Sequence, residues 1–146
     1  MPVKSVTAII IYKKKILLLL RDNRSGVVNP NRWGLIGGGI DFNETPKEAM
    51  EREAKEEINI TPQNLIFFGK TPWGKYRFFS KLTDQERKKI KIGNEGQALK
   101  FYTLEQIKIL KLTPKLSYWV KNYFNELMYL ISTEDIDVRK LKNLIK

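Results

Sequence analysis

Apolar residues form two nearly continuous runs near the start of the chain. Residues 6–12 and 15–21 are rich in isoleucine and leucine, and the pair Lys13-Lys14 separates them. Strands that are covered on both faces carry such uninterrupted apolar runs, whereas half-exposed strands alternate. The pattern therefore predicts a β-hairpin in the middle of a sheet.

Further apolar segments predict a larger sheet. Residues 33–36 are expected to form a short strand that leads into a glycine triplet at 37–39, which predicts a loop, and residues 98–102 form a second short strand. Residues 65–70 and 75–81 flank the sequence Thr71-Pro72-Trp73-Gly74, whose proline and glycine are typical of a tight turn. We expect these two flanking segments to pair as another hairpin.

Capping signals between the strands predict helices. Thr45 followed by Glu48, and Thr103 followed by Gln106, have the spacing of a capping box, and Pro46 and Pro114 suit a first helical position. We expect helices over residues 46–59, 104–110 and 114–131, and a charged helical turn or mobile excursion within 83–94. Residues 133–146 read as a short amphipathic or frayed tail.

This order of elements predicts an α/β domain with a mixed sheet between helices. The length suits one domain over residues 1–146, with a helical tail from about residue 133 and no linker. Nothing before residue 6 resembles a signal peptide, and the apolar run 16–20 is too short to span a bilayer. We expect a cytoplasmic protein without a membrane partner, as a monomer or homodimer.

The amino-acid composition excludes several kinds of catalytic and metal-binding chemistry. Cysteine and histidine are both absent, which excludes disulfides, thiol nucleophiles, imidazole bases and the usual zinc ligands. Metal chemistry must therefore use oxygen ligands, which suit Mg²⁺ or Mn²⁺. The net charge of +11 favours an anionic partner, but the basic residues are dispersed lysines. RNA binding is thus kept open and not favoured.

Six glutamates lie in the glycine-led segment 37–60 of this basic chain. At about 100° per residue, Glu53, Glu56 and Glu57 share one arc of the predicted helix, beside an apolar stripe. Their mutual repulsion costs roughly 0.2 to 0.5 kcal/mol a pair, and a bound cation would reverse it. Spacing alone leaves a solvated acidic face as the alternative.

The segment resembles the Nudix hydrolase family, whose box reads G-x5-E-x7-R-E-U-x-E-E-x-G-U with U aliphatic. The chain supplies Gly38, Glu44, Arg52, Glu53, Ala54, Glu56, Glu57 and Ile60 in register. Asn59 replaces the second glycine, but asparagine tolerates the same left-handed helix end. Ala54 is small for its position, and Ile36 replaces a proline common before the glycines. No carboxylate is affected.

The resemblance implies that the fold is an α/β/α sandwich with a mixed sheet. It also implies that the protein is a metal-dependent hydrolase, whose substrates are nucleoside diphosphates linked to a further group X. The resemblance also implies that water attacks a phosphorus of the diphosphate. Glu53, Glu56 and Glu57 are expected to hold Mg²⁺, with Mn²⁺ as a substitute, together with the Gly37 carbonyl.

The other site residues follow from the same resemblance and from their context. Glu53 or Glu95 is expected to take the proton of the water; Glu95 matches only by its place before the last strand. Arg52 is expected to orient the carboxylates and anchor the loop, and Glu44 has a similar supporting role or holds an outer metal. Glu105 is expected on a helix surface.

Several residues are candidates for substrate contact. Arg21 and Arg24 could bind phosphate oxygens or simply be solvated, and Gly38 and Gly39 allow close backbone approach. The hairpin-tip Trp73 could stack on a base, mediate dimerisation or have no function. The aromatics of residues 114–131 are expected in the core, although Tyr118 or Asn122 at its border could reach a base.

The expected substrate is a free nucleoside triphosphate, normal or oxidised, converted to a monophosphate and pyrophosphate. NDP-sugars, dinucleoside polyphosphates and the 5′ end of RNA remain alternatives because loops decide specificity. A basic nucleotide- or RNA-binding module is the non-enzymatic alternative. Intact clustered carboxylates argue against it, since a pure binder of anions gains nothing from them.

Overall fold

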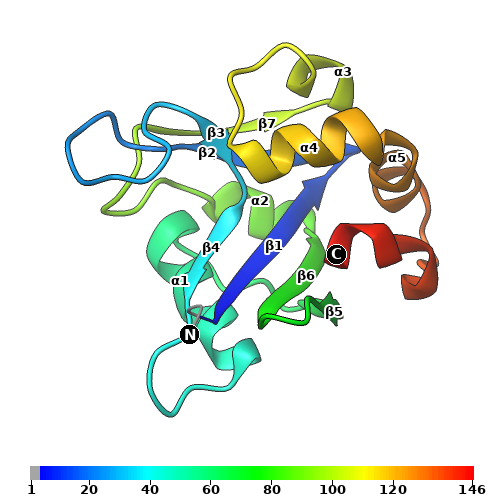
Figure 1. The fold of residues 1–146 in the computed structure, drawn as a ribbon, viewed down its shortest axis with the longest axis horizontal. Helices are drawn as coiled ribbons and strands as arrows, with labels where there is room; N and C mark the ends of the chain where they lie inside the picture. The colour runs from blue at the N-terminus through cyan, green and yellow to red at the C-terminus, as the bar shows by residue number, and fades with distance from the viewer. Residues whose placement is uncertain (1–3) are drawn as a thin grey trace.

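The strands form one mixed sheet with β1 in its centre (Figure 1). The computed structural model describes residues 4–146, and the predicted lack of a signal peptide falls partly on residues 1–3, outside this range. Within residues 4–146 the sheet has seven strands: β1 (Ser5–Tyr12), β2 (Lys15–Leu20), β3 (Trp33–Gly34), β4 (Ile36–Gly39), β5 (Ile66–Lys70), β6 (Lys75–Lys81) and β7 (Ala98–Tyr102).

The two predicted hairpins are present. β1 pairs antiparallel with β2, and Lys13 and Lys14 have φ of 48° and 62°, values typical of a tight two-residue hairpin turn. β5 and β6 also pair antiparallel. β1 runs parallel to β6 and antiparallel to β4, with Thr7 opposite Gly37. The sheet is therefore mixed, as predicted.

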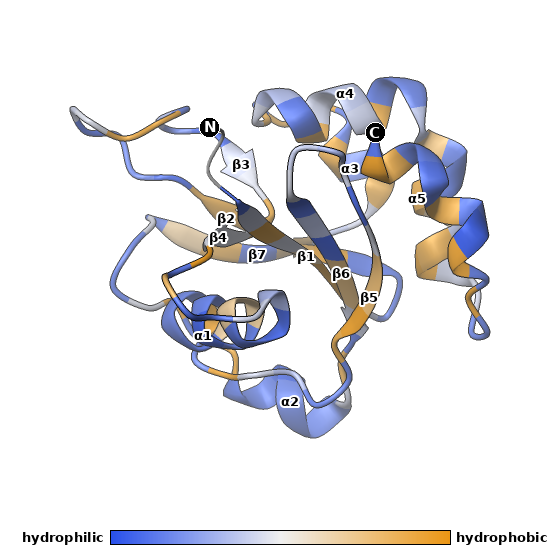
Figure 2. Ribbon diagram, turned by 60° about the horizontal axis from the view of Figure 1, so that its bottom comes forward, coloured by the Kyte–Doolittle hydropathy of each residue, from blue (hydrophilic) through white to orange (hydrophobic). Residues whose placement is uncertain are grey.

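Helices cover both faces of the sheet (Figure 2). One face carries α1 (Pro46–Ile58) and α2 (Asp84–Lys89). The other carries α3 (Leu104–Ile107), α4 (Pro114–Asn122), α5 (Phe124–Ser132) and the 3-10 helix η1 (Val138–Ile145). The expected α/β/α sandwich is confirmed. No helix within residues 4–146 combines the length and apolar character needed to cross a bilayer.

Alternate residues of β1 face two separate hydrophobic layers. Val6, Ala8 and Ile10 pack with α1, whereas Ile9 and Ile11 pack with α4, α5 and η1. All five are at most 2 % exposed. A strand covered on both faces explains the uninterrupted apolar run in the sequence.

The glycine triplet is not the loop that the sequence predicts. Residues 37–39 belong to β4 and pair with β1. A Cβ on Gly37 would lie 2.1 Å from the carbonyl oxygen of Val6. The missing side chain therefore lets two backbones approach closely within the sheet.

The predicted helices near the carboxyl end are shorter than expected. The helix expected over 114–131 breaks at Tyr123, where φ is −129° and ψ is 32°. The break lets α4 and α5 change direction, so that Trp119 and Leu130 bury in one layer. The helix expected to reach residue 110 ends at Ile107, because the amides of Ile109 and Leu110 bond three residues back.

The segment after α5 packs against the core. Leu141 and Leu144 of η1 are fully buried, and both belong to the layer that contains α4 and α5. The tail is therefore amphipathic, as one of the two expectations has it, and it is not frayed.

Candidate active site

Helix α1 carries the candidate chemistry, and its caps set where it begins and ends. The Thr45 hydroxyl accepts a hydrogen bond from the Glu48 amide, and the Glu48 carboxylate accepts one from the Thr45 amide. Pro46 is the first helical residue, and Asn59 ends the helix with a left-handed φ of 73°. These are the capping box, the start and the end that the sequence predicts.

The buried face of α1 sets the direction of its glutamates. Its fully buried residues are Ala49, Met50, Ala54 and Ile58. With that face against the sheet, Glu53 and Glu57 turn toward the edge strand β4. The helix spacing that makes an apolar stripe thus also aims two carboxylates at the glycines.

The glycines of β4 bring their backbone against these carboxylates. Glu57 Oε1 accepts a hydrogen bond from the Gly37 amide at 2.8 Å. Since the N–H and C=O of a strand residue point the same way, the Gly37 carbonyl also faces away from β1. A Cβ on Gly38 would lie 2.4 Å from Glu53 Oε1, so only glycine leaves room for that carboxylate.

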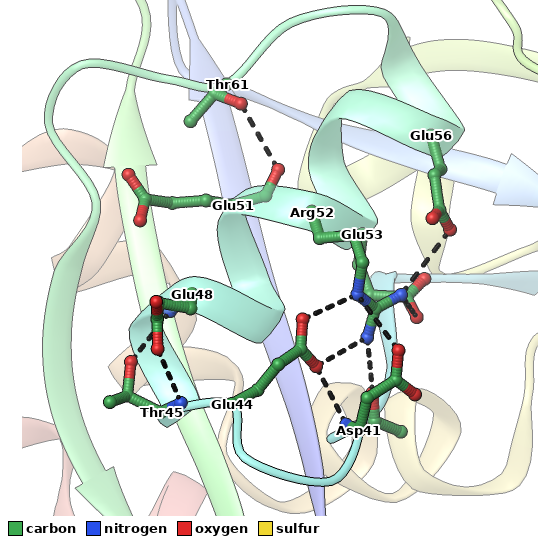
Figure 3. Close-up of polar contacts among 10 residues, drawn as sticks. Asp41, Glu44, Thr45, Glu48, Glu51, Arg52, Glu53, Glu56 and Thr61 are labelled. Carbon is green, nitrogen blue, oxygen red and sulfur yellow. Dashed lines mark hydrogen bonds and ion pairs between the residues drawn. The ribbon is translucent and has the colours of Figure 1, made fainter.

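Arg52 ties the loop before α1 to the helix (Figure 3). Its Nε and Nη2 donate to the two carboxylate oxygens of Glu44 at 2.7 and 2.9 Å. Nη1 donates to Glu53 at 2.9 Å, and Nη2 also donates to the Gly39 carbonyl at 3.0 Å. The Arg52 bonds hold the pKa of Glu44 below its ordinary value. Arg52 and Glu44 are thus bonded to each other next to Glu53, where they can position the Glu53 carboxylate and the loop.

Long-range hydrogen bonds bring the loop that carries Glu95 to the carboxyl end of α1. The amides of Lys91 and Gly93 donate to the carbonyls of Ile58 and Glu57 at the end of α1. A Cβ on Gly93 would lie 1.7 Å from the Glu56 carbonyl oxygen, so the loop packs closely on the helix. On the other side of Glu95 in the sequence, the Gln97 amide donates to the carbonyl of Leu20 in β2 at 2.8 Å. The loop that carries Glu95 is therefore held at both ends.

These elements enclose a pocket of about 410 Å³, which we call the carboxylate pocket. Its lining includes seven of the predicted site residues: Arg21, Arg24, Gly37, Gly38, Glu53, Glu57 and Glu95. Arg21 Nε donates to the Val28 carbonyl at 2.6 Å, which positions that side chain. Arg24 is more exposed and lies 3.7 Å from Asp22. Gly39, Glu44, Arg52 and Glu56 are not in the lining.

The electrostatics of the carboxylate pocket favour a cation. Burial above all, helped by the neighbouring Glu53 and Glu95, raises the pKa of Glu57 to about 8, although the Gly37 amide and Arg21 oppose the shift. Burial also raises the pKa of Glu53 against the opposing bond from Arg52. A hard divalent cation would relieve this repulsion, and these oxygen donors suit it.

Glu56 stands apart from the other two glutamates of the predicted triad. Its side chain is 59 % exposed, and Glu56 Oε2 lies 3.5 Å from Arg52 Nη1. Within residues 4–146, no three carboxylates lie close enough together to surround one ion. Glu56 would have to leave Arg52 to join a metal held by Glu53 and Glu57, so its place in that triad stays a prediction.

Sequence reasoning missed Arg77. This arginine is 4 % exposed, lies on β6 and lines a second pocket of about 300 Å³ beside the carboxylate pocket. The available signal was strand alternation: Lys75 and Arg77 share the face of Phe79, which packs toward α4.

The other candidates lie outside both pockets. Trp73 is 56 % exposed at its hairpin turn, and Tyr118 is 52 % exposed on α4. Asn122 donates to the Tyr118 carbonyl within the same helix. Glu105 lies 3.4 Å from Lys108 on the surface of α3. None of the four lines either pocket.

Comparisons with known proteins agree with this geometry. The model of the NUDIX domain matches residues 1–123. An RNA pyrophosphohydrolase of Marinomonas sp. (strain MWYL1) is 32 % identical over 90 residues, covering 58 % of this chain and 56 % of the relative. Another, from Xanthomonas campestris pv. campestris (strain B100), is 31 % identical over 97 residues, covering 63 % and 47 %. The chain thus spans about half the length of these curated relatives.

A solved structure shares the fold. The crystal structure of a mutT/nudix family protein from Listeria innocua superimposes with a TM-score of 0.68 at 21 % identity. The match covers 88 % of this chain and 95 % of that one.

Proposed function

Because this chain belongs to the NUDIX domain family, we propose that it hydrolyses a diphosphate linkage at the 5′-polyphosphate of a nucleotide, with the aid of Mg²⁺. The observation that carries the proposal is the carboxylate pocket, where Glu53, Glu57 and Glu95 meet two arginines beside a glycine edge. Carboxylates alone would repel a polyphosphate. Together with a bound cation and the two arginines, however, these carboxylates can form a binding site for a polyphosphate.

The donor set fits a divalent metal. Members of this family generally depend on one. Glu53, Glu57 and the Gly37 carbonyl would hold Mg²⁺ or Mn²⁺, and Glu56 would join them after leaving Arg52. When bound, such an ion neutralises phosphate charge and lowers the pKa of a coordinated water.

We assign the proton transfer to Glu95, with Glu53 as the alternative. Glu95 is exposed and forms no hydrogen bond or ion pair within residues 4–146, whereas Glu53 is engaged by Arg52. The Glu95 carboxylate takes the proton as the water oxygen bonds to phosphorus. The bond from that phosphorus to the bridging oxygen breaks, and pyrophosphate leaves with the electron pair.

The remaining predicted residues orient these groups. Arg21 and Arg24 bind the phosphate oxygens at the mouth of the pocket. The Arg52–Glu44 pair holds the Glu53 carboxylate and the loop in place. Gly38 leaves room for Glu53, and Gly39 accepts a bond from Arg52.

Two substrates share the 5′-triphosphate: a free nucleoside triphosphate and the 5′ end of RNA. The sequence alone favours the first. The second is supported by the relatives named RNA pyrophosphohydrolase and by the net charge of +11. We therefore propose the 5′ end of RNA as the substrate and keep the free triphosphate as the second candidate.

The test is a panel of substrates with Mg²⁺, read by product identity. It includes normal and oxidised triphosphates, an NDP-sugar, a dinucleoside polyphosphate and a triphosphorylated RNA. Metal-dependent release of pyrophosphate from the RNA is expected, with faster turnover than from the free triphosphates. Binding without metal-dependent phosphate release from any of them would instead favour a nucleotide-binding module.

A further inference from the structure

The second pocket contains a buried cation that has no acidic partner in the part of the chain that the structure describes. Arg77 is 4 % exposed, and within residues 4–146 no carboxylate forms an ion pair with it. Its Nη1 donates to the Thr7 hydroxyl at 3.1 Å, while its buried Nε has no partner in the same range. A guanidinium has five N–H donors, so most of its hydrogen-bonding capacity is unused.

The guanidinium is held in place by an aromatic ring. Arg77 Cζ lies 5.1 Å from the centre of the Trp119 ring on α4, and Trp119 is itself buried. Burial lowers the pKa of Arg77 to about 10, so it still carries its charge at neutral pH. A charged group that is buried and unpaired is unfavourable, and a bound anion would relieve that cost.

Two lysines add to the positive charge. Lys75 and Lys115 line the same pocket. Burial lowers the pKa of Lys115, and the nearby positive charges of Arg77 and Lys75 lower it further. Lys115 Nζ also donates a long hydrogen bond of 3.4 Å to the main-chain oxygen of Lys146. Among the described residues 4–146, none of those lining this pocket is acidic.

The two pockets adjoin at the edge of the sheet. Arg21, Gly37 and Gly38 line both of them. Glu53 and Glu57 approach this edge from α1, whereas Arg77 lies on the face toward α4. Because the two glycines have no side chains, a ligand can pass from one pocket to the other along bare backbone.

We propose that the Arg77 pocket is a phosphate subsite that holds the first internucleotide phosphate of an RNA whose 5′-triphosphate lies in the carboxylate pocket. The inference rests on the proposed function. A planar guanidinium with unused donors binds phosphate oxygens bidentately, and the lysines at the rim add charge. A free triphosphate has no such phosphate and leaves this subsite unused.

Three substrates separate the contributions of phosphate and base: a nucleoside 5′-triphosphate, the same compound with a 3′-phosphate, and the triphosphorylated dinucleotide. We expect kcat/KM to be about 10- to 100-fold higher for the last two than for the first, since each has the additional phosphate. Equal kcat/KM for all three would overturn the subsite. A gain with the dinucleotide only would also overturn it, because Arg77 would then read the second base.

Substitutions test whether Arg77 and the two lysines bind the additional phosphate. Arg77→Met should remove most of the gain from the extra phosphate and leave hydrolysis of the plain triphosphate within about twofold. Since Arg77 is buried, the double variant Lys75→Gln/Lys115→Gln repeats the test at the rim. Lys111→Gln/Lys142→Gln, which makes the same charge change outside the pocket, should retain the gain. Loss of the gain in this control, or its retention in both pocket variants, contradicts the proposal.

Binding separates failure of the subsite from failure of the proposed function. Analogues of the same three compounds with a methylene bridge in the scissile linkage can be titrated by calorimetry. If wild-type protein hydrolyses none of the substrates but binds the 3′-phosphate analogue more tightly, and Arg77→Met does not, the subsite stands while the proposed reaction fails.

Discussion

Glu57 of α1 accepts a hydrogen bond from the amide of Gly37 in β4, at 2.8 Å. This bond joins the acidic helix to the glycine edge, over 20 residues of sequence. It also holds a carboxylate with a pKa of about 8 among other carboxylates. The proposed chemistry depends on this contact.

Glu57→Gln should fold normally and lose at least about 100-fold in kcat with Mg²⁺. The amide oxygen of glutamine can still accept the bond from Gly37, but it carries no charge to hold a metal. Steady-state kinetics and thermal unfolding check both parts. Glu51→Gln, on the same helix and outside both pockets, is the matched control. Normal turnover by Glu57→Gln would show that the metal lies elsewhere.

Metal should stabilise the protein more at high pH. The folded state binds the Glu57 proton more tightly than the unfolded chain, so metal-free protein loses stability as the pH rises from 4.5 towards about 8. A divalent cation bound to this carboxylate offsets the cost of burying its charge and the repulsion from Glu53 and Glu95, which together cause this loss. The rise in melting temperature with Mg²⁺ should therefore be larger at pH 8.5 than at pH 5.5. Glu57→Gln should lose most of this difference; an unchanged difference would contradict the assignment.

Gly38→Ala should displace Glu53. Its Cβ would lie 2.4 Å from Glu53 Oε1, so the carboxylate must move away from the glycine edge. We expect a fall in kcat of about tenfold or more and a lower melting temperature. In a Glu53→Ala background the same substitution should have little effect on melting temperature. Equal destabilisation in both backgrounds would indicate a clash with some other group.

Arg52→Lys should lower kcat about tenfold while the protein stays folded. Lysine keeps the charge but cannot bond both oxygens of Glu44 and reach Glu53 at once. A positioning role predicts a change in kcat with little change in KM. Lys47→Arg on the same helix serves as control. A rise in KM alone would point instead to direct binding of substrate by Arg52.

Asn59→Gly should be nearly neutral, whereas Asn59→Ala should cost about 1 kcal/mol of unfolding free energy. Residue 59 has a φ of 73°, which glycine adopts freely and alanine does not. Glycine does lose the bond from Asn59 Nδ2 to the Lys89 carbonyl, which is exposed. Urea unfolding of the two variants measures the difference. Equal stability of both would argue against the left-handed cap.

Local signals determined much of the fold. The hairpin at Lys13-Lys14, the capping box at Thr45 and the helix end at Asn59 depend on neighbours in sequence, and each is present in the structure. The box pattern also identified the family, because its residues are closely spaced in one segment that runs from β4 through a loop to α1.

Tertiary packing decided how those residues meet. Helical spacing put Glu53, Glu56 and Glu57 on one arc, but only the packing of α1 on the sheet turned Glu53 and Glu57 toward β4. Arg52 lies 3.5 Å from Glu56, which remains largely exposed. Glu95 was a candidate by context, and it lines the pocket because its loop bonds to the end of α1 and to β2.

The sequence by itself determined the family and the α/β class and predicted the candidate site residues, because periodicity, caps and motif spacing are local properties. Only the tertiary structure decided that the glycines form a strand, that the last long helix breaks at Tyr123, and that Arg77 is buried against Trp119 with no carboxylate of residues 4–146 paired to it. Those outcomes depend on contacts between segments far apart in the chain, which no local pattern encodes.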